Sequence, residues 1–160
     1  MSDAGACAVF DFVDGGFPST YLCSLQELLC LYDVLLAQAA QRGAEWVVME
    51  IADGLLQRET SALLQCSEFT RTVSDWFFAA GDPLAAAGGL RVLQNWDLRP
   101  AAIAGLVTMS PLGMREATEA TGVRCLTTAE LRDASIVSVL DDASPSALEE
   151  SGELRAVGTT

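Results

Sequence analysis

The sequence predicts an α/β domain built on a doubly wound, mostly parallel sheet of five strands. Three observations lead to this fold class. Apolar segments of strand length alternate with helical patterns five times along the chain. Some of these segments are continuously apolar, as strands covered on both faces are. The connections are short, and helical crossovers of this kind join parallel neighbours.

The five predicted strands are short apolar runs that end in small or polar residues. They cover residues 7–13, 46–49, 75–80, 101–107 and 123–126. Trp46–Met49 contains no polar residue, and Pro100 stands directly before the fourth run. The first run leads into Asp14-Gly15-Gly16, a sequence typical of turns.

Helices are predicted between these strands from their capping signals. Ser24, with Glu27 three residues later, has the capping-box spacing, and leucines follow at helical spacing as far as a stop at Gly43. Asp82-Pro83 and Ser110-Pro111 each pair an N-cap residue with a first helical proline. Shorter helical segments are expected within residues 55–64, 67–71 and 128–132.

One domain is expected over residues 1–140, because a chain of 160 residues with 51% hydrophobic content can bury one core. From Asp141 onward the composition becomes polar and acidic, so residues 141–160 are expected to form a poorly ordered or peripheral tail. No apolar run reaches the roughly 18 residues of a membrane helix. The first residues also lack the basic start of a secretory signal, and a cytoplasmic protein is therefore expected.

The charge balance disfavours nucleic acids and membrane surfaces as partners. Nine basic residues, all arginine, oppose 22 Asp and Glu, for a formal net charge of −13. Such a chain repels phosphate backbones and anionic lipids. The absence of histidine and lysine excludes Ser-His and Cys-His nucleophilic pairs, histidine metal ligands, Schiff-base chemistry and a P-loop lysine. The five cysteines form no C-x-x-C pair and are expected to be reduced, with Cys23 and Cys66 as the two candidates for reactivity.

The densest chemical signal is Glu50-Ile51-Ala52-Asp53-Gly54, at the predicted exit of the second strand. Ligands of parallel sheets bind beyond the carboxyl ends of the strands. A carboxylate at a buried strand tip is unfavourable unless it is solvated, paired or bound to a cation. Asp11 and Asp14 lie at the end of the first strand, so four carboxylates are expected at one edge, where they suggest a Mg²⁺ site. The alternative is that each carboxylate caps a loop or a helix N-terminus.

Five polar residues beside this segment complete the candidate site. Arg58, the only cation near the predicted acidic edge, either binds a phosphate or carboxylate or neutralises a neighbouring acid. Glu59 and Thr60 follow it directly. The hydroxyls of Ser19 and Thr20, in the first loop, either contact a ligand or stabilise a turn.

Two segments, Asp11–Tyr21 and Met49–Thr60, resemble an uncharacterised bacterial family of P-loop proteins that is similar to dethiobiotin synthetase. A weaker similarity includes Phe78–Ala80 and Thr108–Leu112, and the whole resemblance spans about residues 7–130. The resemblance implies a nucleotide-dependent phosphoryl-transfer or ligase-type activity that uses ATP and Mg²⁺. It also implies that the glutamate at this strand exit, here Glu50, binds the metal.

The resemblance also implies that the loop with Asp14, Ser19 and Thr20 approaches the metal or the acceptor substrate, and together with the residue types it gives each candidate residue an expected role. Glu50 and Asp11 are the expected metal ligands. Asp14 and Asp53 would hold metal-bound water or activate a small-molecule acceptor, and Arg58 would neutralise developing charge. The expected cofactor-binding residues are Ser19, Thr20, Glu59 and Thr60.

The chain departs from this family at the phosphate-binding loop, because the motif G-x-x-x-x-G-K-[ST] requires a lysine. The chain therefore looks like the portion downstream of the P-loop, without the Walker A unit. The strand that ends at Glu50 would then lack a neighbouring strand. Either a partner chain or a second copy of this chain supplies that strand, or the gene model is truncated. Two alternatives remain: a non-catalytic binding or interaction module derived from a P-loop fold, and a complete flavodoxin-like or receiver-like domain.

Overall fold

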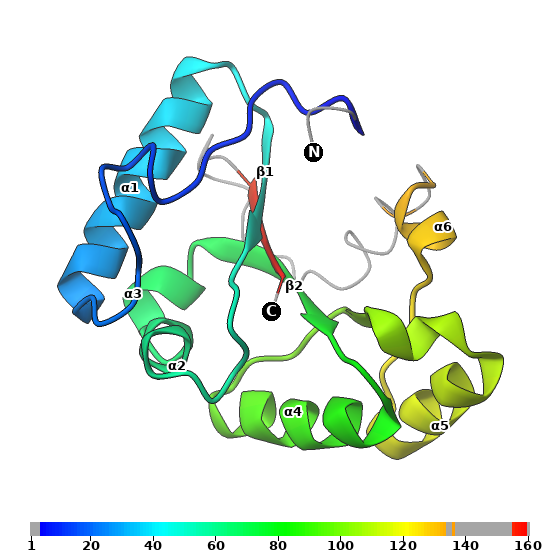
Figure 1. Cartoon of the computed structure of the whole chain (residues 1–160). Coiled ribbons are helices and arrows are strands. Elements are labelled where there is room, and N and C mark those ends of the chain that lie inside the picture. Colours follow the sequence, from blue (N-terminus) through cyan, green and yellow to red (C-terminus); the bar gives the residue numbers. More distant parts are fainter. Residues whose placement is uncertain (1–3, 134–135, 137–154, 160) are drawn as a thin grey trace.

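The computed structural model of this chain describes residues 4–133, 136 and 155–159. Its strands form one four-stranded sheet in the order β1-β4-β2-β3 (Figure 1). The strands are β1 (Trp46–Glu50), β2 (Val73–Ala79), β3 (Ala102–Ala104) and β4 (Arg155–Thr159). Every pairing between neighbouring strands is parallel, so the carboxyl ends of all four strands lie at one edge of the sheet.

The predicted five-stranded, doubly wound sheet is wrong, first because residues 7–13 form turns and coil instead of a strand. The carboxylate of Asp14 accepts the N–H of Asp11, and that of Asp11 accepts the N–H of Val13. Local side-chain bonds of this kind compete with strand pairing for the backbone. The apolar side chains of this segment are accordingly half-buried or exposed.

The predicted fifth strand, residues 123–126, is also missing from the sheet. It forms one isolated parallel bridge, between Ile103 and Cys125. The segment has no room to extend the pairing, because β3 ends at Ala104 and a capping box at Thr127 opens the next helix directly.

The strand inside the sheet that the sequence did not predict comes from the expected tail. β4 lies between β1 and β2, with the backbone of Thr159 level with Glu50 on one side and Phe77 on the other. Residues 141–154 and 160 of that tail lie outside the described residues. The place beside β1, predicted to need another chain or copy, is thus taken by residues of this chain.

Six α-helices are described, and their capping residues explain where they begin. They are α1 (Leu25–Gln41), α2 (Arg58–Leu64), α3 (Ser67–Thr70), α4 (Pro83–Asn95), α5 (Pro111–Thr121) and α6 (Thr128–Leu131), with a 3-10 turn η2 (Leu106–Met109). The predicted N-caps are confirmed at Ser24, Asp82 and Ser110, each of which accepts a backbone N–H through its side-chain oxygen. No helix within the described ranges is long and apolar enough to cross a membrane.

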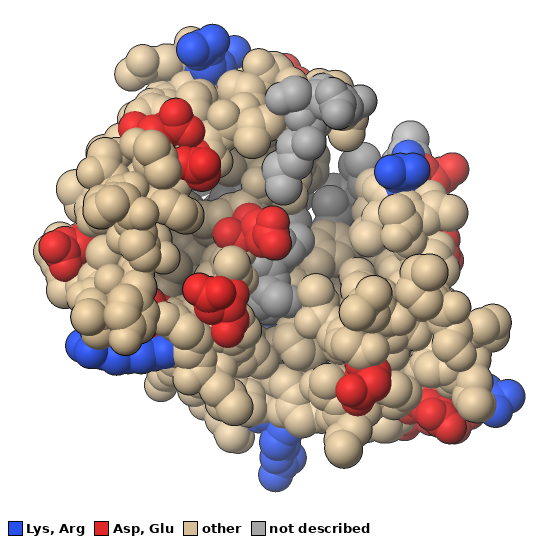
Figure 2. Space-filling model, viewed as in Figure 1, with Lys and Arg blue, Asp and Glu red and all other residues tan. Residues whose placement is uncertain are grey.

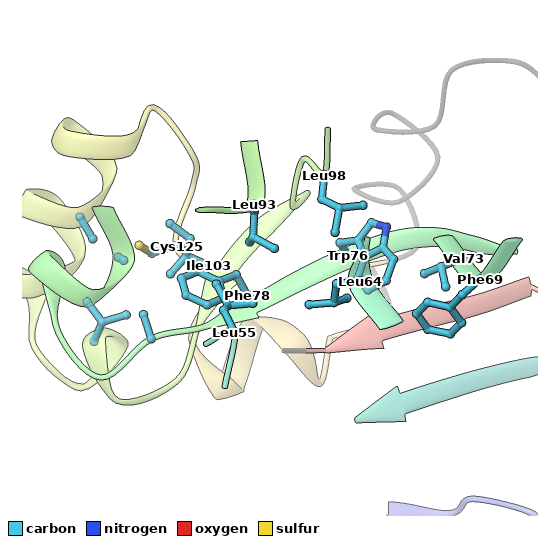
Figure 3. Close-up of a cluster of buried hydrophobic side chains, with 14 of the residues drawn as sticks. Leu55, Leu64, Phe69, Val73, Trp76, Phe78, Leu93, Leu98, Ile103 and Cys125 are labelled. Atoms are coloured by element: carbon cyan, nitrogen blue, oxygen red, sulfur yellow. The ribbon is translucent and has the colours of Figure 1, made fainter. Parts of the chain in front are cut away.

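The core lies between β2 and the helices and is drawn in Figure 3. Leu64 of α2, Phe69 of α3 and Ile103 of β3 are almost fully buried. The Phe69 ring packs edge-on against Tyr32 and Trp76, with centroid separations of 5.0 and 6.0 Å. Such aromatic pairs stabilise beyond the area that they bury, and this one joins α1, α3 and β2.

Two close contacts at the sheet depend on glycine: that of α4 with β2, and that of the β3 exit with the β2 exit. A Cβ on Gly89 would overlap the ring of Phe78 in β2, so this helical glycine lets α4 lie directly on the strand. A Cβ on Gly105 would lie 2.9 Å from the carbonyl oxygen of Ala80, and Gly105 also has φ of 91°. These contacts fix the exits of β2 and β3 side by side at the carboxyl edge.

Candidate functional site

The exit of β1 places two carboxylates in solvent at the carboxyl edge of the sheet. Glu50 is the last residue of β1 and is exposed. Asp53 and Gly54 follow with φ of 70° and 79°, a left-handed conformation that Asp and Gly tolerate better than most residues. The chain therefore turns sharply after the strand, which leaves the side chain of Asp53 exposed as well.

Asp11 and Asp14 do not complete a metal cluster with these two residues. Their carboxylates accept backbone N–H groups within their own turn, at 2.7 Å for Asp11 and 2.9 Å for Asp14. This is the loop-capping arrangement that the sequence left open as an alternative. Within the described ranges, no group of three or more His, Cys, Asp or Glu side chains lies close enough to hold a metal ion.

Ser19 and Thr20 lie in a turn that leads into α1. The hydroxyl of Ser19 accepts the N–H of Tyr21 at 3.0 Å, and the carbonyl of Thr20 accepts the N–H of Cys23 at 3.2 Å. The side chain of Ser19 therefore stabilises the turn, as the second interpretation of this residue expected.

Glu59 and Thr60 are buried and tie two loops together. One carboxylate oxygen of Glu59 accepts the N–H of Leu22 at 2.8 Å, and the other accepts the side-chain amide of Gln57. Thr60 donates its hydroxyl to the carbonyl of Ala52 at 2.9 Å. These contacts hold the loop of Ser19 and Thr20 against the exit of β1. Glu59 and Thr60 therefore stabilise the loops around the site. Sequence reasoning missed Gln57, because glutamine is an uncommon N-cap residue.

Arg58, the first residue of α2, points its charge outward. It is exposed and forms no ion pair with another described residue, so the predicted neutralisation of Glu50 or Asp53 does not occur here. Figure 2 shows that basic and acidic side chains are also apart over one face of the molecule. Basic side chains lie at the margin of this face, whereas acidic ones also lie near its middle.

Cys23 lies beside this network but is a poor nucleophile. Partial burial and the carboxylates of Glu27 and Glu59 raise the pKa of the Cys23 thiol above its ordinary value. A raised pKa lowers the thiolate fraction at neutral pH, and the thiolate is the reactive form. The geometry therefore argues against one of the two cysteines that the sequence left as reactive candidates.

The segments that follow β2 and β3 add exposed apolar side chains to the same edge. Leu84, Leu106 and Met109 are 83%, 73% and 79% exposed. The nearby hydroxyls are used locally: Thr108 donates to the carbonyl of Gly105, and Ser110 caps α5. The edge thus combines an acidic part at the β1 exit with an apolar part at the exits of β2 and β3.

No family model, curated protein or solved structure matches this chain. The chemistry of the edge is therefore argued from its own groups. A solvated carboxylate such as that of Glu50 or Asp53 can bind a hard cation together with a ligand that brings further oxygen atoms. Arg58 can bind a phosphoryl or carboxyl group at the start of α2.

Proposed function

We propose that this chain is the Mg²⁺-binding, acceptor-side portion of an ATP-dependent phosphoryl-transfer or ligase-type protein of the P-loop class. The observation that carries the proposal is the exposed carboxylate of Glu50 at the carboxyl tip of β1, in an all-parallel sheet. Ligands of parallel sheets bind at this edge. The resemblance of Met49–Thr60 to the metal-binding strand exit of that family supports the same assignment.

A single protein carboxylate is enough for this role. Magnesium bound with a nucleotide usually takes one or two carboxylates and completes its shell with phosphate oxygens and water. The lack of a three-acid cluster within the described residues argues against a cage made by the protein alone. It is compatible with Mg²⁺ that arrives as its ATP complex and contacts Glu50.

Asp53 and Arg58 would act on the acceptor. Asp53 is solvated and lies three residues beyond Glu50, so it would hold metal-bound water or accept a proton from the acceptor. Arg58 has no ion-pair partner among the described residues, which leaves its guanidinium for the charge that develops on a phosphoryl or carboxyl group.

The sequence contains no lysine, so the phosphate-binding lysine of a P-loop would have to come from residues outside it, in a partner chain or upstream in a longer gene product. We therefore expect weak nucleotide binding by this chain alone and stronger binding with a partner, in the cytoplasm, where ATP is available. The substrate would be a small-molecule acceptor.

A second candidate function is a non-catalytic interaction module. The observation that favours it is the apolar part of the edge, since Leu84, Leu106 and Met109 are each exposed in the segments that follow β2 and β3. Such a module would bind a protein through this surface and would need neither Mg²⁺ nor a nucleotide.

Amide NMR of the chain with Mn²⁺ and ATP separates the two functions, because paramagnetic Mn²⁺ takes Mg²⁺ sites and broadens nearby signals. The proposal predicts broadening that is strongest at residues 50–54 and weak at Glu45, at the other end of β1. Uniform broadening, or broadening centred elsewhere, would contradict the metal assignment and leave the interaction module as the better account.

A further inference from the structure

A cavity of about 520 Å³ lies away from the site proposed above, at the amino end of β3. Its volume is within the roughly 300–1,000 Å³ typical of small-molecule sites. Among the residues that the structure describes, six line it: Leu90, Gln94, Asp97, Arg99, Pro100 and Val123. They come from the second half of α4, the connection from α4 to β3, and the segment after α5. The proposed metal site uses none of them.

Three of the six lining residues, Leu90, Pro100 and Val123, form an apolar wall. Leu90 is 6% exposed, Pro100 is buried and Val123 is half-buried. This wall suits a small apolar group, whose transfer from water is favourable.

Two of the other lining residues carry opposite charges and do not pair with each other. Asp97 and Arg99 are both exposed, and neither forms an ion pair with another described residue. Gln94 adds an amide that can both donate and accept hydrogen bonds. A ligand with an ammonium and a carboxylate would therefore find a partner for each charge.

The position of Asp97 strengthens the case for a cationic group. Asp97 follows the C-terminus of α4, the end of a helix that carries partial negative charge, and the last turn of α4 contains no basic residue. Its φ of 58° is the left-handed conformation that glycine or asparagine usually supplies at this point. A carboxylate adds unfavourable negative charge here, and a bound ammonium would reverse that effect.

We propose that this cavity binds a free α-amino acid with an apolar side chain. The ammonium group would lie between Asp97 and the C-terminal end of α4, and the carboxylate would pair with Arg99, with Gln94 as a further hydrogen-bond partner. The side chain would pack against the apolar wall. The proposal does not depend on the function of the β1 exit.

Isothermal titration with three related ligands tests this assignment. L-leucine carries both charges, 4-methylpentanoate lacks the ammonium, and 3-methylbutylamine lacks the carboxylate. We expect leucine to bind and each single-charge analogue to bind roughly 10-fold to 100-fold more weakly, because each loses a charge-assisted hydrogen bond.

Two conservative variants identify the residues responsible. Arg99→Gln should bind leucine no more tightly than the unaltered chain binds 3-methylbutylamine. Asp97→Asn should bind leucine no more tightly than the unaltered chain binds 4-methylpentanoate. Asparagine keeps the left-handed turn, so the fold is retained, and circular dichroism checks this. Arg91→Gln removes an arginine of α4 that does not line the cavity and should bind leucine like the unaltered chain.

Three results would overturn the proposal. The first is the absence of heat at millimolar leucine, phenylalanine and methionine. The second is equal affinity for leucine and either analogue. The third is unchanged leucine binding in both Arg99→Gln and Asp97→Asn.

Discussion

The buried carboxylate of Glu59 in α2 accepts the backbone N–H of Leu22 at 2.8 Å, across 37 residues of sequence. Leu22 has φ of 63°, an unfavourable value for leucine, so this hydrogen bond holds a strained turn in place. Through it, the loop that precedes α1 is fixed to the helix that follows the β1 exit. The two loops of the candidate site therefore form one unit.

Glu59→Ala is expected to release the first loop. The variant removes the acceptor of the Leu22 N–H and of the Gln57 amide, and a hydrogen bond to a charged group contributes about 1.5–3 kcal/mol. Hydrogen exchange at the Leu22 amide should become faster, and the free energy of unfolding should fall. Glu68→Ala, at an exposed position in α3, is the matched control. Unchanged exchange at Leu22 would show that the bond does not hold the loop.

Adjacent glycines in α4 should respond to alanine with opposite signs. A Cβ on Gly88 meets nothing within 4 Å, whereas one on Gly89 overlaps the Phe78 ring. Gly88→Ala should stabilise the chain by about 0.5–1 kcal/mol through helix propensity. Gly89→Ala should destabilise it by roughly 1–3 kcal/mol through overpacking. Chemical denaturation measures both, and equal effects would mean that α4 does not lie on β2 as described.

The place of β4 inside the sheet can be tested with proline. Val157 is paired with Val48 of β1 and with Asp75 of β2, and proline in a central strand removes a ladder hydrogen bond. Val157→Pro should destabilise the chain by about 3 kcal/mol or more, well beyond the effect of Val157→Ala, which keeps the N–H. Equal stability of the two variants would place residues 155–159 outside the sheet.

The capping box of α1 makes part of the stability depend on pH. Hydrogen bonds from the backbone and side chain of Ser24 lower the pKa of Glu27 below its ordinary value. A lowered folded-state pKa stabilises the fold above the ordinary glutamate pKa of about 4.3. That contribution is lost as the pH falls through the folded-state value. Glu27→Gln, which removes the titrating group, should therefore lower Tm more at pH 7 than at about pH 3, and an equal loss at both values would contradict the pKa shift.

Local signals in the sequence predicted the helices well. Asp82-Pro83 and Ser110-Pro111 open α4 and α5 because an N-cap and a first helical proline act within one turn. The strands were harder to predict, because pairing depends on distant partners. The apolar run at 7–13 does not form a strand, because hydrogen bonds from the Asp11 and Asp14 side chains favour turns there. β4 was missed because its short sequence follows a polar, acidic stretch.

The candidate site was predicted in part. Glu50 and Asp53 lie exposed at the strand exit where the sequence placed them, because a sharp change from apolar to acidic residues marks the end of a strand. The burial of Glu59 could not be anticipated, since a charged side chain is rarely buried without a partner, and its partner, Leu22, is remote in sequence. The cavity beside Asp97 and Arg99 was missed for the same reason, because Leu90 and Val123 meet only in the fold.

The most direct test of the central claim is isothermal titration of Mg·ATP into the chain, into Glu50→Gln and into Glu45→Gln. Glu45 is an exposed acid just before β1, so its variant makes the same change of charge at the opposite end of the strand. The account predicts weak but saturable binding by the unaltered chain and by Glu45→Gln, and none by Glu50→Gln. Equal binding by all three, or none by the unaltered chain at millimolar Mg·ATP, would contradict a metal-nucleotide site at the exit of β1.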